Sequence, residues 1–589
     1  MKNTWIIGLV LMIIMSGFTV SLTFLSPTVR AYTPHDPISI NGDADFAIKA
    51  TAEGWPGNGT VGNPYIINGL EIDGSEGNGI EIRHTNAYFI IEDSKIDNGK
   101  HGIYLKDVTH GTIDNCMMED NTHALYLESS DENNLINNIL TFNWIGIRLE
   151  TSSDNQIVDN SVSNNSGGIA LWNSTENDIT DNNVLNNGNG IYLWNSDGNN
   201  VTGNSAINCD AGIWIKFCIN NNIANNIMIE DGILLEGNLI EQWNTHHIDI
   251  SNSVNSKPVF YWKNLTSGIV PSGAGQIILA NCTNIKVENQ MVTHGSAGIE
   301  LGFSSINNIL KNEASSNKKY GIYLYSSNGN TILNNNASNN GVGLYIENSN
   351  ENSILNNNAS SNDNEGVILR TSEGNDITNN TANNNHHGID LYEAIGNNLT
   401  DNPVSDNVVG VQLYTSHSNN LTNNVFSDNN IGLYLITNST KNLMVGNDVS
   451  SNRGRGVVLS FSNNNIFYHN NIRNNGAQLH LTLSFNTWDN GNQEGNYWSD
   501  YIGDDNDGDG IGDTDIPHHG VDHYPLMEPF DISGEEDESN DNGQALIFYE
   551  RWFIILMAII VLVIIMFLAF SLGRKRKYAE IPPEKEKKE

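Results

Sequence analysis

The sequence predicts an all-β fold: a right-handed, single-stranded parallel β-helix solenoid with coils of about 22 residues, followed by one C-terminal transmembrane helix. Glycine recurs at a fixed interval, aliphatic residues alternate behind each glycine, and asparagine fills fixed positions further along each repeat. The most regular stretch contains Gly146, Gly168, Gly190 and Gly212, which are spaced 22 residues apart. A repeat this short and this rich in asparagine and glycine excludes helical hairpin repeats.

Each coil begins with a strand that has one buried face. Ile191 and Leu193 follow Gly190 with one outward residue between them, and the neighbouring coils repeat this arrangement. Alternation with period two is typical of a half-buried strand. A second aliphatic position follows later in each coil, so we expect a strand, a turn and a second strand per repeat. Stacked coils then pair in parallel at ~4.8 Å, and such crossovers are right-handed.

Asparagine occupies the predicted corners of the coils in two phases. One phase contains Asn155, Asn177, Asn199 and Asn221, and the other contains Asn160, Asn182, Asn204 and Asn226. Asparagine tolerates the left-handed backbone conformation, and stacked amides hydrogen-bond along a ladder. A disordered asparagine-rich tract would lack the strictly phased isoleucine and leucine.

The phase of the repeat and shifts in composition divide the chain into segments. We assign a signal peptide to 1–31, an N-terminal cap with the first coils to 32–78, a regular block to 79–231, irregular coils with insertions to 232–297, a second regular block to 298–487, a C-terminal cap to 488–530, an acidic linker to 531–546, a transmembrane helix to 547–572 and a cytoplasmic tail to 573–589. The irregular segment spans three repeat lengths, so we expect three further coils there whose turns carry insertions.

Both ends of the chain carry membrane-targeting patterns. Residues 1–31 have a basic start, an apolar run and a small-residue end, as in a cleaved secretory signal; an uncleaved anchor is the alternative. Residues 552–572 carry no charge, and the basic run 574–577 follows at once. This predicts a single-pass protein of the cell membrane with an extracellular N-terminal part. Asn-X-Ser/Thr sequons such as Asn173 could then carry glycans.

Charge and cysteine positions exclude other roles. A net charge of −40 excludes nucleic acid as a partner, because a polyanion would be repelled. Cys116, Cys209, Cys218 and Cys282 fall at mismatched phases or in distant coils, so we expect no disulfide.

Aromatic residues form two lanes along the predicted outer face of the first block. The aromatic members of these lanes are Tyr104, Tyr126, Trp172, Tyr192, Trp194 and Trp214. Exposed rings beside carboxylates on a flat sheet suit sugars, whose apolar ring faces stack while their hydroxyls hydrogen-bond at the rim. The alternative is that the lanes only stabilise pairing between coils.

The irregular segment breaks the repeat, and broken local rules often mark function. Its candidates for a lateral pocket are His246, His247, Asp249, Lys257, Tyr261 and Trp262. The alternative is a tolerated insertion. The chain also has three adjacent histidine pairs, at 246–247, 386–387 and 518–519. Neighbouring side chains of a strand point to opposite faces, so no pair chelates copper by itself unless it lies in a turn.

The acidic run GDDNDGDGIGDTD predicts a structural calcium site. The predicted ligands are the carboxylates of Asp505, Asp507, Asp509 and Asp513 and the backbone carbonyl of Ile511. Gly510 provides the tight turn, and Ile516 stands where a helix-flanked sensor loop has glutamate, so the run resembles the short loops of extracellular modules. The ion would tie the C-terminal cap onto the last coil. A flexible acidic turn without metal is the alternative.

Several longer stretches resemble one family. PISINGDADF, GNPYII, SVNSKPVFYWKN, GAGQIILANCTNI and GNYWSDYIGDDNDGDGIGDTDIPHHGVDHYPLM together resemble NosD-like right-handed β-helix proteins, relatives of the pectin lyase-like fold that are abundant on archaeal surfaces. The resemblance covers about residues 37–530 and implies a carbohydrate-binding or sugar-hydrolysing type of domain. The founding family assists copper-site assembly in nitrous-oxide reductase, and the C-terminal membrane anchor departs from that soluble accessory.

These features predict a membrane-anchored extracellular β-helix that binds carbohydrate or a surface glycoprotein without catalysis. One alternative is a polysaccharide lyase or glycoside hydrolase, although we find no converging pair of carboxylates in the sequence pattern. A second alternative is a copper-delivery accessory protein.

Overall fold

The computed structural model describes residues 32–532, and all structural statements below concern these residues. The segments assigned to the signal peptide, the transmembrane helix and the cytoplasmic tail, and nearly all of the acidic linker, lie outside them. Within residues 32–532, no helix has the length and apolar character needed to cross a membrane.

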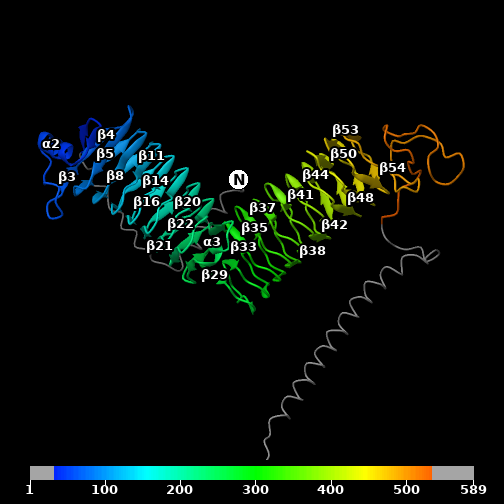
Figure 1. The fold of residues 1–589 in the computed structure, drawn as a ribbon, viewed down its shortest axis with the longest axis horizontal. Helices are drawn as coiled ribbons and strands as arrows, with labels where there is room; N and C mark the ends of the chain where they lie inside the picture. The colour runs from blue at the N-terminus through cyan, green and yellow to red at the C-terminus, as the bar shows by residue number, and fades with distance from the viewer. Residues whose placement is uncertain (1–31, 533–589) are drawn as a thin grey trace, which may run out of the picture. The chain divides into compact units, whose positions relative to one another are not determined.

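The described chain is a parallel β-helix, as predicted, with strands stacked coil upon coil (Figure 1). The coils of the first block contribute strands to three sheets. The sheet that carries the aromatic lanes, here called the first face, contains β2 (Ile38–Asn41), β5 (Asn78–Thr85), β8 (His101–Val108), β11 (His123–Glu128), β14 (Ile145–Glu150), β17 (Gly167–Trp172), β20 (Asn189–Trp194), β23 (Ala211–Lys216) and β26 (Ile233–Glu236). A second sheet runs from β3 (Tyr65–Asn68) to β27 (His247–Ile248), and a third from β1 (Thr33–His35) to β28 (Ser253–Val254).

The second block repeats this plan. Its equivalent sheet, here called the second face, contains β29 (Lys257–Lys263), β31 (Gln276–Ala280), β33 (Ala297–Gly302), β35 (Tyr320–Tyr325), β37 (Val342–Glu347), β39 (Glu365–Arg370), β41 (His387–Tyr392), β44 (Val409–Tyr414), β47 (Ile431–Ile436), β50 (Arg455–Ser460) and β53 (Ala477–Thr482). The other sheets run from β30 (Gly268–Ile269) to β51 (Ile466–Tyr468) and from β43 (Pro403–Ser405) to β54 (Tyr497–Trp498).

Buried asparagine ladders hold the corners together. The Asn177 amide Nδ2 donates to Asn199 Oδ1 at 3.1 Å and to the Ser152 carbonyl at 3.0 Å, and the Asn177 backbone N–H donates to Asn199 Oδ1 at 2.9 Å. The left-handed conformation, however, belongs to the residue before the ladder asparagine, such as Glu176 (φ 56°). The sequence analysis assigned both tasks to one residue. The structure separates them, because the ladder amide must point inward while the turn residue stays outside.

The repeated glycines are explained by close packing between coils. A Cβ atom at Gly190 would lie 2.5 Å from the carbonyl oxygen of Gly212 in the next coil. Only glycine allows the backbones to approach this closely. The four cysteines in the described chain are buried and free.

Between β26 and β33 the chain forms three sets of strands, which begin at β26, β29 and β31, but it reverses direction between the first set and the second. β28 pairs antiparallel with β29 through a two-residue turn, in which Asn255 (φ 50°) and Ser256 (φ 64°) both take the left-handed conformation. Such a turn reverses the chain, as in a type I′ hairpin. Stacking therefore stops at β26 on the first face and begins anew at β29. A short helix, α3 (Glu241–Asn244), lies between the two.

Side chains of the second block cover the open edge of β26. The N–H of Ile233 donates to Gln276 Oε1 at 2.9 Å, and the N–H of Leu235 donates to Glu300 Oε2 at 3.0 Å. Gln276 Nε2 in turn donates to Glu300 Oε1 at 2.7 Å. Glu300 is fully buried, and this burial raises its pKa to about 8. The two blocks are thus joined by polar side chains that replace the next strand.

Each end of the solenoid has its own cap. At the N-terminal end, α2 (Asp43–Glu53) inserts Phe46, whose ring stacks on Tyr65 at 4.6 Å. At the C-terminal end, Trp488 and Trp498 are buried, and Trp498 Nε1 donates to Asp522 Oδ2 at 2.8 Å. The helix α2 was not predicted, although the acidic first turn and the four-residue spacing of Phe46 and Ala50 indicate it.

Candidate functional site

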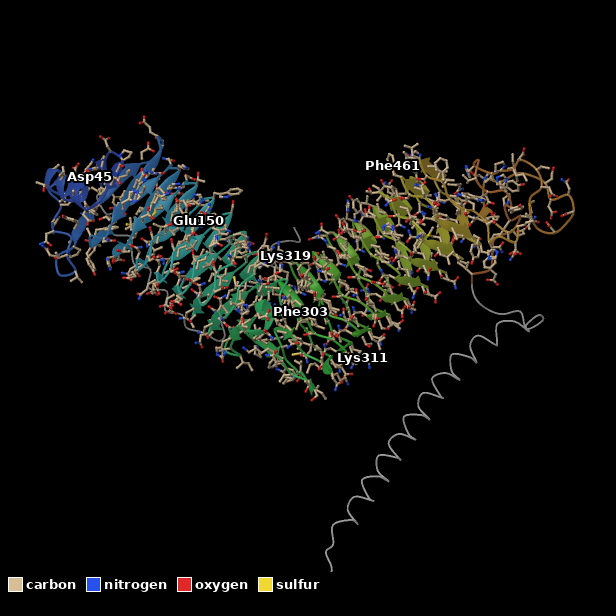
Figure 2. All side chains as sticks on the ribbon, in the orientation of Figure 1. Asp45, Glu150, Phe303, Lys311, Lys319 and Phe461 are labelled. Carbon is tan, nitrogen blue, oxygen red and sulfur yellow. The ribbon has the colours of Figure 1, made fainter. Side chains whose placement is uncertain are left out.

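Strand pairing on the first face aligns outward side chains in two lanes. The first lane contains Tyr104, Tyr126, Arg148, Ala170, Tyr192 and Trp214, and the second contains Lys106, Glu128, Glu150, Trp172, Trp194 and Lys216. Glu150 is labelled in Figure 2. The sequence lanes are therefore reproduced as register partners on successive strands.

The tyrosines at the start of the first lane contact each other and their neighbours. Tyr104 and Tyr126 stack with ring centroids 5.2 Å apart, and the Tyr126 hydroxyl donates to Glu150 Oε2 at 2.7 Å. The Tyr104 hydroxyl donates to Glu128 in the same way, and Tyr104 is only 7% exposed. Tyr104 was expected to be an exposed ring. Its burial corrects that expectation, because stacking and the carboxylate cover it.

Ala170 interrupts the lane and leaves a groove of about 190 Å³. Lining residues include Trp144, Ser166, Ala170, Trp172, Asn189 and Tyr192. Trp144 is 64% exposed, and Trp172 meets Tyr192 edge to face at 6.2 Å. The sequence analysis missed Trp144, Ser166 and Ala170 as site residues. The signal in the sequence was Trp144, where the neighbouring coils have threonine and serine, and Ala170, where they have arginine and tyrosine.

Polar groups border this groove. The Arg148 guanidinium lies 4.3 Å from the Trp172 ring centroid, and Arg148 Nη2 donates to Glu150 Oε2 at 2.7 Å. Arg148 Nε is buried without a hydrogen-bond partner. Burial raises the pKa of Tyr192 to about 12, so its hydroxyl stays protonated and can donate. The groove therefore combines aromatic walls with hydrogen-bonding groups.

Beyond the groove, the last two strands of the first face carry an ion pair between Lys216 and Glu236. Lys216 Nζ lies 5.2 Å from the Trp214 ring centroid and 2.8 Å from Glu236 Oε2. Trp214 Nε1 is buried without a hydrogen-bond partner. Trp194 is half-exposed and pairs in register with Trp172.

The candidates in the irregular segment do not form the expected pocket. His246 is fully buried, and its Nδ1 accepts from the Asn221 N–H at 3.2 Å, so it continues an asparagine ladder. Burial lowers the pKa of His246 to about 4. His247 is exposed on the opposite side of β27, and Asp249 Oδ1 caps a turn by accepting from Ser251 at 2.8 Å.

Two further candidates of that segment are also structural. The Tyr261 hydroxyl donates to the Trp243 carbonyl, and Trp262 packs against the second hydrophobic core. Only Lys257 lines a nearby cavity, of about 290 Å³. Most of these side chains therefore pack or form hydrogen bonds within the segment where stacking stops at β26 and begins again at β29.

The acidic loop partly gathers the predicted calcium ligands. Carboxylate oxygens of Asp505, Asp507 and Asp513 lie within 4.8 Å of one another. Asp509 Oδ1 instead accepts from the Ile511 N–H at 2.9 Å. The Asp509 N–H favours the charged form of Asp507, but the combined repulsion from Asp509, Asp513 and Asp505, together with desolvation, prevails and raises the pKa of Asp507. The loop thus concentrates negative charge.

On the second face, the structure brings His387, a member of one histidine pair, together with two acidic residues that were not predicted as site residues. Glu365, His387 and Asp390 each offer a ligand atom within a 4.8 Å group. Asp390 is 5% exposed, and burial raises its pKa to about 6. His387 Nδ1 lies 3.7 Å from Glu365 Oε1 and is buried without a hydrogen-bond partner. The sequence could have indicated this cluster, because Glu365 and Asp390 are charged at repeat positions where nearby coils have apolar or aromatic residues.

Comparisons with known proteins agree with this architecture. The family model described as "Periplasmic copper-binding protein (NosD)" matches residues 57–259 and 358–503, together more than half of the chain. A second model, "Right handed beta helix region", matches residues 217–359 and 267–426. A search of curated proteins gave no match.

Similar solved structures include three polysaccharide-acting proteins. The periplasmic alginate epimerase AlgG is 15% identical, with 75% of this chain and 85% of that chain covered and a TM-score of 0.22. The A-module of the Azotobacter vinelandii mannuronan C-5 epimerase AlgE6 is 12% identical, covering 76% and 94%, with a TM-score of 0.19. A PL6 alginate lyase in complex with a trisaccharide is 12% identical, covering 85% and 93%, with a TM-score of 0.19. On the family match and the observed solenoid, the chain belongs to the NosD family of right-handed parallel β-helix proteins.

Proposed function

We propose that the first face binds a polysaccharide, with a sugar ring seated in the groove above Ala170. The observation that carries this proposal is the interrupted lane. A small residue stands where neighbouring coils present tyrosine, tryptophan or arginine, and Trp144, Trp172 and Tyr192 border the space that it leaves. Sugar rings stack on aromatic walls of this kind, and their hydroxyls can hydrogen-bond with Ser166, Asn189 and the Tyr192 hydroxyl, which line the groove.

The charges near the groove favour an uncharged glycan. Arg148 is already paired with Glu150, and Lys216 is already paired with Glu236. Neither cation is free to neutralise a polyanion, and the chain as a whole carries a net charge of −40. An acidic polysaccharide would be repelled at low salt.

Retention on immobilised polysaccharides tests this proposal. The purified chain should be retained by at least one neutral polysaccharide, and no new reducing or unsaturated ends should form. Trp172→Ala should weaken retention at least tenfold, because it removes a groove wall. Trp194→Ala is the matched control, since this half-exposed tryptophan is the register partner of Trp172 but does not line the groove. Equal retention by both variants and the parent chain would refute the groove.

The second face supports a second candidate function, cleavage of a polysaccharide. Asp390 has a pKa raised to about 6 by burial, which suits a general acid at neutral pH, and His387 and Glu365 lie beside it. Under this alternative, release of new chain ends should occur with the parent chain and should fall at least a hundredfold in Asp390→Asn. Absence of new ends across the panel would leave binding as the function.

Two further proposals rest on the sequence. We propose that an N-terminal signal and the apolar segment 547–572 place the protein on the cell surface. We also propose that the acidic loop binds calcium through Asp505, Asp507 and Asp513, with Asp509 turning inward on binding. Calcium would offset the mutual repulsion of these carboxylates. Removing calcium with a chelator should lower the melting temperature by several degrees, and Asp507→Ala with Asp509→Ala should abolish that response. A copper-delivery role, suggested by the family description, is the remaining alternative.

A further inference from the structure

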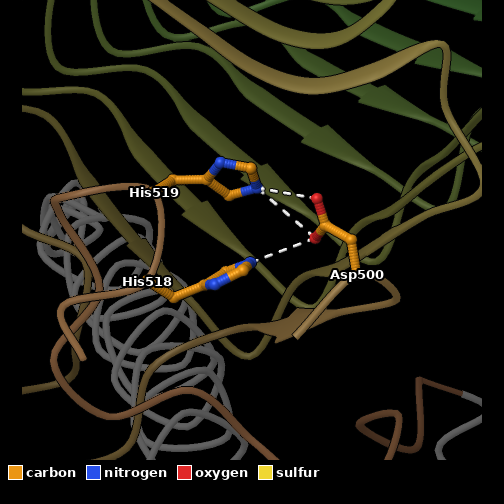
Figure 3. A group of neighbouring side chains, drawn as sticks. All are labelled: Asp500, His518 and His519. Carbon is orange, nitrogen blue, oxygen red and sulfur yellow. Dashed lines mark hydrogen bonds and ion pairs between the residues drawn. The ribbon is translucent and has the colours of Figure 1, made fainter. Parts of the chain in front are cut away.

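Two adjacent histidines and a carboxylate converge in the C-terminal cap, and none of them belongs to the groove or to the predicted calcium ligands. His518 Nε2 lies 3.0 Å from Asp500 Oδ1, and His519 Nε2 lies 3.3 Å from the same oxygen and 3.1 Å from Asp500 Oδ2 (Figure 3). The two imidazole rings are 4.2 Å apart, centroid to centroid. Both rings therefore direct Nε2 toward one carboxylate.

The backbone explains why neighbouring side chains meet here. In a strand, His518 and His519 would point to opposite faces. Instead they lie in a turn: His519 takes the left-handed conformation (φ 50°), and the His518 N–H donates to the Asp522 carbonyl at 2.7 Å. A turn is the condition under which adjacent histidines can chelate, and of the three pairs it is this one that meets it.

Surrounding groups hold the cluster in place. The Trp498 ring lies 5.6 Å from His518 and 5.0 Å from His519, so it forms a wall behind both imidazoles. Trp498 is itself fixed by its hydrogen bond to the buried Asp522. The His518 side chain is 14% exposed and that of Asp500 is 44% exposed, so the donor atoms are shielded on one side and reachable on the other.

We propose that His518, His519 and Asp500 form a binding site for a divalent transition-metal ion of the zinc and copper class. Bonds of about 2.0–2.2 Å in tetrahedral geometry place neighbouring ligand atoms roughly 3.3–3.6 Å apart. The observed nitrogen-to-oxygen distances, 3.0, 3.1 and 3.3 Å, are at or slightly below this spacing, and the donor atoms of the three residues lie within 4.8 Å of one another. Small movements of the side chains therefore suffice to place an ion between them.

The ligand set selects the class of metal. Two imidazoles and one carboxylate suit zinc, copper, nickel or cobalt, whereas calcium and magnesium prefer oxygen ligands alone. Three protein ligands leave at least one coordination position for water or for an external ligand. The C-terminal cap would then hold two sites of different chemistry, an oxygen site in the acidic loop and this nitrogen-rich site.

Titration of the full-length chain, freed of metal and carrying no histidine tag, tests the site. Zinc should bind with micromolar or tighter affinity in calorimetry, and cobalt should give a visible absorption band typical of nitrogen coordination. His518→Ala with His519→Ala should weaken zinc binding at least tenfold and remove the cobalt band. His523→Ala is the matched control, because this exposed histidine lies in the same loop, and it should bind as the parent chain does.

Two further variants separate metal binding at this site from a folding defect and from binding at the second-face cluster. Asp500→Asn keeps the shape of the side chain and should weaken zinc binding. This variant therefore tests the site even if the double histidine variant does not fold. His387→Ala removes the histidine of the second-face cluster and should leave zinc binding unchanged. The proposal is overturned if the parent chain takes up no zinc, if the double variant binds as tightly as the parent, or if binding is lost in His387→Ala.

Discussion

A tyrosine cluster on the second face and the interrupted lane on the first face show two different arrangements of aromatic side chains. On the second face, Tyr320, Tyr323 and Tyr345 pack against one another, with ring centroids 4.9 to 5.3 Å apart, and Tyr323 is 3% exposed. On the first face, the lane is broken at Ala170, and the rings on either side of the break border a groove. Tyrosines that pack closely cover one another's ring surface, whereas a small residue beside aromatic neighbours leaves ring surface for a ligand. Aromatic content alone therefore does not distinguish a binding face from a structural one.

The largest expected difference between the faces is in stability. Tyr323→Ala should lower the free energy of unfolding by about 3–5 kcal/mol, because it empties a fully packed position in a hydrophobic cluster. Trp172→Ala should cost roughly 1 kcal/mol, because that ring is half-exposed and loses mainly its contacts with Arg148 and Tyr192. Chemical denaturation of both variants measures the difference, and equal losses would contradict the distinction between the faces.

A second prediction concerns the junction that separates the faces. Burial raises the pKa of Glu300 to about 8 in the folded chain, from 4.5 for an ordinary glutamate. The folded state therefore holds a proton that the unfolded state loses above pH 4.5, so this group's stabilising effect is complete below pH 4.5 and is lost as the pH rises toward about 8. The slope is about 1.4 kcal/mol per pH unit, or roughly 3 kcal/mol between pH 6 and pH 8.

Glu300→Gln removes the titration, because glutamine has no proton to lose. Its amide keeps an oxygen to accept from the Leu235 N–H but loses the acceptor for Gln276 Nε2, so the test is the pH dependence and not the absolute stability. The free energy of unfolding of the variant should fall less between pH 6 and pH 8 than that of the parent chain. Denaturation midpoints at several pH values provide the measurement. Parallel pH profiles for the two proteins would show that Glu300 does not titrate as a buried acid.

The smallest effect is expected from completing the broken lane. Ala170→Tyr should fill the groove and raise the free energy of unfolding by about 0.5–1.5 kcal/mol, since the new ring can stack on Tyr192. The same variant should lose glycan retention. If Ala170→Tyr is more stable but still retained by the glycan, the glycan binds elsewhere. If the variant is less stable, the groove is too small for a tyrosine ring.

Local repetition explains which features were predictable. Coil phase, aliphatic pairs and ladder positions such as Asn177 follow from a pattern that each coil repeats with its nearest neighbours, so the sequence predicts the solenoid and the two lanes. The junction was not predictable, because Gln276 and Glu300 contact β26 from more than 40 residues away and have no counterpart in other coils. Residue spacing indicated three coils in this segment, but it did not indicate the reversal of the chain at Asn255.

The candidate sites divide in the same way. Trp172 and Tyr192 were selected because they stand in phase, whereas the groove depends on the absence of a side chain at Ala170, which a search for chemical groups overlooks. His246 was selected as an irregular residue, yet it fills an asparagine position in a ladder. His518 and His519 converge only because of the turn conformation at His519, which the order of residues does not reveal.

The asparagine ladders also determine how such a protein can change in length during evolution. Asn155 donates to Asn177 as Asn177 donates to Asn199, each over a separation of 22 residues. A gene segment that encodes one whole coil can be duplicated or lost without leaving an unpaired amide, since the new neighbours present the same donors and acceptors. An insertion of another length within a coil would break the ladders together unless it loops out. Members of the family can therefore grow or shrink by whole coils while the caps and the groove stay unaltered.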